Sequence, residues 1–202
     1  VDTKPAKELK GKPELVKMVK DILEPVGKMD GDSLPVSAFA DHVDGQFELG
    51  ASAYEKRGVA VSVPTWDAAK CIQCNQCAYV CPHAVIRPFL ATEEEAAASG
   101  VEWKQGLGET KEYKFRIQSS PMDCTGCSNC VDVCPAKDKA LVMRPLEEQM
   151  PQQKNWDYIT KNIGYKQVVD KTKSVKNLQF AQPLFEFSGA CAGCGETPYI
   201  KA

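Results

Sequence analysis

Eight of the ten cysteines fall into two runs with the same spacing. Each run has the form C-x2-C-x2-C-x3-C-P and ends at Pro82 or Pro135. This spacing is typical of paired 4Fe-4S clusters, in which each run gives three thiolates to its own cluster and its fourth thiolate to the other. The sequence therefore predicts one cluster on Cys71, Cys74, Cys77 and Cys134, and a second cluster on Cys124, Cys127, Cys130 and Cys81.

Two other uses of these cysteines fit the sequence less well. Disulfide frameworks are typical of small secreted chains with a higher cysteine density, and the printed sequence shows no signal-peptide pattern. Zinc ribbons use two C-x2-C pairs, whereas each run here has four cysteines before a proline, and the histidines are only His42 and His83. Iron-sulfur ligation is the preferred interpretation, and zinc is the main alternative.

The composition indicates an ordered protein of one or two domains. The 202 residues carry a formal net charge of -2 and are 43% hydrophobic. No basic region points to nucleic acid, and no apolar run approaches the roughly 18 residues that a membrane-spanning helix needs. Because thiols must stay reduced to hold iron, we expect a cytoplasmic protein with no nucleic-acid or membrane partner.

The segments that flank the two runs also repeat. Strands are predicted before the runs, over Val59–Val63 and Tyr113–Ile117, and after them, over Val85–Leu90 and Leu141–Leu146, where both segments contain Arg-Pro. The order strand, cysteine loop, short helix, strand therefore occurs twice. We expect an α+β fold in which residues 59–150 form a duplicated ferredoxin-like domain with two 4Fe-4S clusters.

An insertion separates the two copies. Forty-two residues lie between Cys81 and Cys124, and the insertion covers about residues 91–112. Its Glu93–Ala98 segment favours a helix that Gly100 would end. The preferred interpretation is a solvated elaboration, and the alternative is that the insertion covers a cluster or contacts another domain.

Residues 1–58 are predicted to be an inter-domain connector with one helix. Pro13 suits the first turn, an apolar stripe follows over Leu15–Leu23, and Pro25 and Gly27 should end the helix. Residues 31–57 are rich in Gly, Asp and Pro and are expected to be extended along other protein. The strand that follows should end at Pro64.

Residues 151–202 are predicted to be a linker and the beginning of a further domain. A strand over Pro183–Gly189 should enter a turn that carries a third pair, Cys191 and Cys194. A lone C-x2-C pair is ambiguous, because it fits half of a metal site, a redox pair or two buried thiols. The chain begins without Met and ends eight residues after Cys194, so we expect a piece of a longer protein.

Three segments resemble one enzyme family. Lys70–Pro88, Pro183–Tyr199 and Tyr54–Gly58 are similar to pyruvate:ferredoxin (flavodoxin) oxidoreductase. The resemblance implies that residues 151–202 open an α/β thiamine-diphosphate-binding domain with its first strand, and that Cys191 and Cys194 belong to a third 4Fe-4S cluster. It also implies that thiamine diphosphate and Mg bind elsewhere in the parent enzyme. The implied partners are the remainder of that enzyme, its substrates pyruvate and CoA, ferredoxin or flavodoxin as electron acceptor, and a second copy in a homodimer.

Two functional hypotheses follow. The first is the electron-relay portion of a 2-oxoacid:ferredoxin oxidoreductase, which carries single electrons from a thiamine-bound intermediate to ferredoxin or flavodoxin during oxidative decarboxylation to acyl-CoA. The alternative is an independent two-cluster ferredoxin-type carrier. The connector and the pair Cys191 and Cys194 lie outside the repeated module and favour the first. No catalytic residue is expected within this chain.

Overall fold

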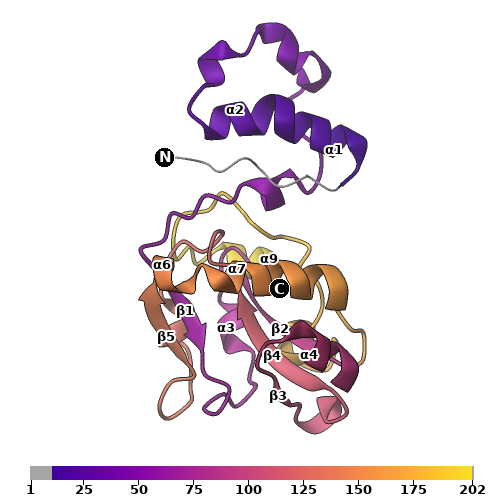
Figure 1. Ribbon diagram of the computed structural model, residues 1–202, viewed down its shortest axis with the longest axis vertical. Coiled ribbons are helices and arrows are strands. Elements are labelled where there is room, and N and C mark those ends of the chain that lie inside the picture. The colour runs from indigo at the N-terminus through magenta and orange to yellow at the C-terminus, as the bar shows by residue number, and fades with distance from the viewer. Residues whose placement is uncertain (1–10, 202) are drawn as a thin grey trace. The chain divides into compact units, whose positions relative to one another are not determined.

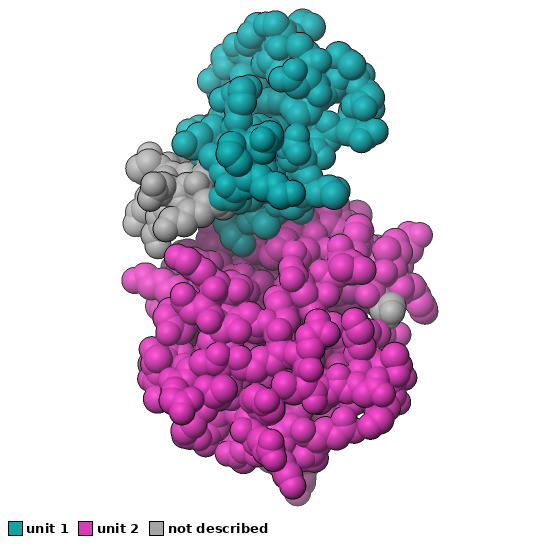
Figure 2. Space-filling view, turned by 90° about the vertical axis from the view of Figure 1, so that its right-hand side faces the viewer, with its two compact units in different colours: residues 1–56 teal, residues 57–202 magenta. Residues whose placement is uncertain are grey.

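The chain forms two compact units, residues 1–56 and 57–202 (Figure 2). The computed structural model describes residues 11–201, so the first ten residues of the predicted connector lie outside the described part. The boundary falls two residues before the predicted end of the connector at residue 58.

The first unit is built around the predicted helix. α1 (Pro13–Met18) continues through a π-helical turn (Val19–Leu23) into α2 (Glu24–Gly27). The helix passes Pro25 and ends at Gly27, the second of the two predicted terminators. It passes the proline because the wider π-helical turn directly before it shifts the backbone hydrogen bonds that the proline would interrupt. Its buried side chains recur at helical spacing and share one face: Leu15, Met18, Val19 and Ile22.

The prediction of an extended connector is wrong for residues 31–54. This segment forms three short 3-10 helices, at Gly31–Ser33, Val36–His42 and Ala51–Tyr54. Apolar side chains from these turns pack on the buried face of the helix: Leu34, Phe39, Ala51 and Tyr54. The helix therefore buries its apolar stripe against the segment that follows it, as an amphipathic helix must.

The second unit contains two antiparallel sheets within its described residues (Figure 1). β1 (Ser62–Trp66) pairs with β5 (Leu141–Pro145). β2 (Ile86–Ala91) pairs with β4 (Lys114–Ser119), and β3 (Lys104–Gln105) adds to the other side of β4. Each sheet thus joins a strand that flanks the first cysteine run to one that flanks the second.

Three of the predicted strands coincide with β2, β4 and β5 to within two residues at each end. The prediction that β1 ends at Pro64 is wrong, because the strand continues to Trp66 with Pro64 opposite Met143. β1 is an edge strand, where a proline is tolerated because its missing N–H can face away from the partner.

Short helices follow each cysteine loop, α3 (Gln76–Tyr79) and α5 (Asn129–Asp132). The helix predicted in the insertion is confirmed as α4 (Glu93–Ser99). A capping box between Thr92 and Glu95 begins it, and Gly100 ends it with a φ of 66°, which favours glycine.

Residues 151–201 lie in the same compact unit as the cysteine runs. They form α7 (Pro151–Tyr158) with a π-helical turn (Ile159–Ile163), α8 (Val175–Leu178) and α9 (Thr197–Lys201); α6 (Leu146–Gln149) precedes them. Trp156 and Ile159 pack on Phe89, and Phe180 reaches the main core. The linker is therefore packed on the ferredoxin-like part, and its continuation into a further domain stays a prediction. Across residues 11–201, no helix has the length and apolar character needed to cross a bilayer.

Two cysteine-lined cavities as candidate metal centres

The first cavity gathers cysteines from both runs. Three come from the first run and the fourth from the end of the second: Cys71, Cys74, Cys77 and Cys134. Trp66, Ile117 and Leu141 complete an apolar wall. The structure therefore brings together the four residues that the sequence assigned to one site.

The second cavity has the reciprocal arrangement. Its cysteines are Cys124, Cys127 and Cys130 of the second run with Cys81 of the first. Val85, Ile86 and Met143 contribute apolar surface, and His83 also lines it. The crossing follows from the sheets, because β1 pairs with β5 and β2 with β4, so that the end of each run lies beside the other.

Left-handed residues shape both cysteine loops. Gln73 and Asn75 have φ values of 59° and 61°, and the equivalent residues Gly126 and Ser128 have values of 72° and 66°. Such turns point successive backbone N–H groups toward one centre and create a site for negative charge. Each loop thus curls its amides around the sulfurs.

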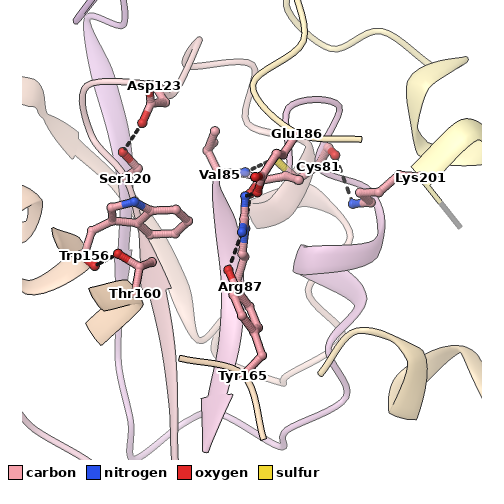
Figure 3. A network of polar contacts seen from close by, with 11 residues as sticks. Cys81, Val85, Arg87, Ser120, Asp123, Trp156, Thr160, Tyr165, Glu186 and Lys201 are labelled. Carbon is pink, nitrogen blue, oxygen red and sulfur yellow. Dashed lines mark hydrogen bonds and ion pairs between the residues drawn. The ribbon is translucent and has the colours of Figure 1, made fainter. Parts of the chain in front are cut away.

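Backbone amides donate to the first and last sulfur of each run. Gln73 N–H donates to Cys71 Sγ and Gly126 N–H to Cys124 Sγ, both at 3.4 Å. Val85 N–H donates to Cys81 Sγ (Figure 3) and Ala140 N–H to Cys134 Sγ, again at 3.4 Å. Hydrogen bonds to sulfur stabilise the thiolate form that binds metal.

Burial of the cysteines disfavours the negatively charged thiolate form. It raises the pKa of the Cys124 thiol to about 12, with Cys81 and Cys127 adding repulsion. Burial likewise raises the pKa of Cys77 and Cys130 well above the ordinary value. Thiolates in these cavities therefore require a compensating cation, and four sulfurs around an apolar cavity with amide donors suit a 4Fe-4S cluster.

The cavities differ in shape from a site for one zinc ion. A tetrahedral zinc with bonds of about 2.3 Å places its sulfurs only about 3.8 Å apart. Within residues 11–201, no group of three or more His, Cys, Asp or Glu is arranged to hold a single ion. In each cavity the four cysteines instead line an apolar hollow together with hydrophobic side chains.

The insertion is hydrogen-bonded to the first cysteine run, which favours the alternative interpretation, that it covers a cluster, over a solvated elaboration. Lys104 Nζ donates to the carbonyls of Ala68 and Cys71 at 2.6 and 2.7 Å. The buried Gln73 side chain donates to Gln105 O at 2.7 Å and accepts from Leu107 N at 3.0 Å. These contacts went unforeseen, although Gln73 stands where the second run has Gly126.

The linker closes over the same run. Asn75 Nδ2 donates to Lys176 O at 3.0 Å. Nearby, Phe180 packs edge to face on Phe115 with ring centroids 6.1 Å apart. The insertion and the linker, which both lie outside the repeated module, therefore both contact the first cysteine run.

The third pair lies beside the second cavity. Cys191 is exposed and Cys194 is half-buried, and hydrogen bonds from the amides of Thr197 and Glu196 lower the pKa of Cys194. A Cβ added at Gly193 would lie 3.5 Å from Cys127 Cβ. The turn that carries the pair thus contacts the second cysteine run directly.

The strand predicted over Pro183–Gly189 is not formed. The segment is irregular and donates one backbone hydrogen bond, from Phe187 N to His83 O at 2.9 Å. A strand requires a partner strand for its ladder, and the second unit supplies none to this segment within its described residues.

Comparison with known proteins defines the class first. A family model described as a 4Fe-4S dicluster domain matches residues 70–137, and a model described as a domain of unknown function matches residues 2–60. The second unit is thus a ferredoxin-like α+β protein with a 4Fe-4S dicluster domain.

Individual relatives are similar to a longer part of the chain than the family models are. The chain is 53% identical over 190 residues to a pyruvate-flavodoxin oxidoreductase of Enterobacter agglomerans, covering 93% of the chain and 16% of the relative. It is 51% identical over 187 residues to a pyruvate:ferredoxin oxidoreductase of Moorella thermoacetica, covering 91% and 16%. A pyruvate dehydrogenase (NADP+) of Cryptosporidium parvum is 48% identical over 200 residues, covering 96% and 10%.

The resemblance to the pyruvate:ferredoxin (flavodoxin) oxidoreductases is therefore confirmed over about nine-tenths of the chain. The chain spans 16% or less of the length of these three relatives.

Proposed function

We propose that this chain is the electron-relay segment of a 2-oxoacid:ferredoxin or flavodoxin oxidoreductase, with pyruvate as the substrate. The observation that carries the proposal is the pair of crossed cysteine cavities, with the turn of a third cysteine pair lying close to Cys127 through Gly193. The relatives bear names of pyruvate oxidoreductases and support the choice of substrate.

Each cavity would hold one 4Fe-4S cluster, which accepts and passes on one electron at a time. The ligands would be Cys71, Cys74, Cys77 and Cys134 for the first, and Cys124, Cys127, Cys130 and Cys81 for the second. The amides of Gln73, Val85, Gly126 and Ala140 would stabilise the negative charge on the sulfurs. The matched loops and reciprocal strand pairing support an origin by duplication of one half-domain.

The overall reaction of the parent enzyme would be pyruvate + CoA → acetyl-CoA + CO2 + H+ + 2 e−. Thiamine diphosphate with Mg, bound outside this chain, would supply the carbon chemistry. The reaction releases two electrons, whereas each cluster takes one, so a relay must separate them. Cys191 and Cys194 would contribute two ligands to a third cluster completed by the remainder of the enzyme.

The packing supports an order for the relay. Gly193, between the two cysteines of the third pair, lies close to Cys127, so electrons would enter through the second cavity. Ile72, which is 53% exposed, lies at the first cavity and leaves that side accessible to ferredoxin or flavodoxin.

An independent two-cluster carrier is the second candidate. In such a carrier, Cys191 and Cys194 and the position of their turn near Cys127 would have no function. Anaerobic addition of pyruvate and CoA to the full-length protein distinguishes the two. Appearance of reduced-cluster EPR signals with about twelve iron per chain supports the relay, whereas about eight iron and reduction by dithionite alone supports the carrier.

A further inference from the structure

Arg87 is a buried cation that connects β2 to the C-terminal segment. The residue is 4% exposed. Its guanidinium donates from Nε to Ala84 O at 2.5 Å, from one terminal nitrogen to Tyr165 Oη, and from the other to Glu186 Oε2 at 2.5 Å (Figure 3). Arg144, the equivalent residue in the second copy, is exposed. Burial of this arginine is therefore not a property of the repeated module.

Aromatic rings surround the same guanidinium. Its Cζ lies 5.0 Å from the ring centroid of Trp156, 5.4 Å from that of Phe187 and 5.8 Å from that of Tyr165. A buried charge persists only when it is paired and hydrogen-bonded, and loss of one partner is costly. The C-terminal segment is thus fixed to β2 through Arg87, which contacts residues between Trp156 and Phe187.

The segment fixed by Arg87 leads directly to the third cysteine pair. Next to Glu186, Phe187 N–H donates to His83 O at 2.9 Å, and His83 Nδ1 donates to Ser188 O at 2.9 Å. Ser188 Oγ donates to Pro82 O at 3.1 Å. Pro82 and His83 follow Cys81, which lines the second cavity.

Phe187 shows that this path is imposed by its surroundings. Its φ of 51° lies in the left-handed region, which is unfavourable for an aromatic residue. Such a conformation is retained where neighbouring contacts fix it. The chain then continues to Gly193, where an added Cβ would lie 3.5 Å from Cys127 Cβ.

We propose that Arg87 is a positioning residue that, through Glu186, holds residues 183–190 on the module and so keeps the turn of Cys191 and Cys194 against the second cavity. This inference rests on the proposed function and deepens it. Electron transfer between centres falls steeply with their separation, so a fixed gap between the third pair and Cys127 determines how fast electrons enter. The salt bridge supplies this fixed gap in advance of the reaction.

The test uses the full-length holoprotein with two variants and a matched control. Arg87→Lys keeps the charge but loses the fork that reaches Glu186 and Tyr165 together, and Glu186→Gln removes the ion pair with little change of shape. Arg144→Lys makes the same change at the exposed equivalent position. Three quantities are measured: amide hydrogen exchange over residues 183–195, the rate of cluster reduction by pyruvate with CoA, and the rate with dithionite.

In Arg87→Lys and Glu186→Gln we expect amide hydrogen exchange over residues 183–195 to accelerate by about tenfold or more, with little change in the exchange of β2. Reduction by pyruvate should slow by about tenfold or more, because small displacements of a positioned group are costly. Iron content and reduction by dithionite should match the wild type. Arg144→Lys should change none of these quantities.

Unchanged protection of residues 183–195, or unchanged reduction by pyruvate, would overturn the proposal. Equal slowing with both donors together with loss of iron would also overturn it, because Arg87 would then only support the fold. If pyruvate fails to reduce even the wild-type clusters, the proposed function fails, and the exchange measurement alone decides whether Arg87 and Glu186 hold the segment.

Discussion

Replacing Gln73 with alanine should loosen the insertion, here called the cover, from the first cysteine run and so make the first cavity more accessible. The Gln73 side chain is 1% exposed and holds two backbone groups of the insertion, Gln105 O and Leu107 N. Alanine removes both hydrogen bonds but leaves those that Lys104 donates to Ala68 and Cys71. The insertion would therefore loosen at one end and remain attached at the other.

The size of the effect follows from the two hydrogen bonds. Residues 105 and 107 are exposed, so water replaces part of each lost interaction. We therefore use the net value of about 1 kcal/mol for each bond rather than the full penalty for a buried unpaired group. A total of about 2 kcal/mol shifts the equilibrium toward the open cover by about 30-fold.

The assay is iron release to a chelator from the anaerobic full-length protein. Release in the wild type should be slow from both cavities, whereas Gln73→Ala should show a fast phase from the first cavity only. Gln76→Ala, an exposed glutamine in the same run, is the matched control and should behave as the wild type. Gln73→Gly loses the same hydrogen bonds but relieves the left-handed φ of 59°, so it should release iron as fast while unfolding less readily than Gln73→Ala. Unchanged release, or equal acceleration from both cavities, would refute this account of the cover.

Three further outcomes are expected. Cys134→Ser should alter the EPR signal of the cluster on Cys71, Cys74 and Cys77 more than that of the cluster next to it in sequence, and the reverse pattern would remove the crossing. Cys191→Ala in the full-length protein should abolish reduction by pyruvate while dithionite still reduces both ferredoxin-type clusters; normal pyruvate-dependent reduction of ferredoxin would contradict a role for this pair. Removal of iron should abolish most of the cooperative unfolding transition of the second unit, because Cys77, Cys81, Cys124 and Cys130 belong to its buried core. Calorimetry of the iron-free protein checks this, and an unchanged transition would show that the core does not depend on the clusters.

The sequence carries strong local information about the cysteine loops and their flanking strands. The spacing of the runs predicted which four cysteines share each cavity, because fixed intervals restrict how a loop can curl. The capping residues Thr92 and Gly100 likewise specify α4 by local hydrogen bonds and backbone conformation.

Contacts between distant segments were not predictable in the same way. The cover by the insertion depends on Gln73 reaching Gln105 and Leu107, and the docking of the C-terminal segment depends on Arg87 reaching Glu186. Neither set of contacting residues recurs at a helical or strand period. Polar residues such as Gln73, Arg87 and Glu186 are also of the types that usually lie on the solvated surface. The connector was misjudged for a related reason, since the spacing of Leu34, Phe39 and Tyr54 is too irregular to reveal that they share one core.

The most direct test of the central claim is anomalous diffraction at the iron edge from crystals of the anaerobically purified full-length protein. We expect four-iron density in two cavities, one bound by Cys71, Cys74, Cys77 and Cys134, and the other by Cys124, Cys127, Cys130 and Cys81. A single zinc ion in either cavity, or a cluster whose four cysteines all come from one run, would contradict it.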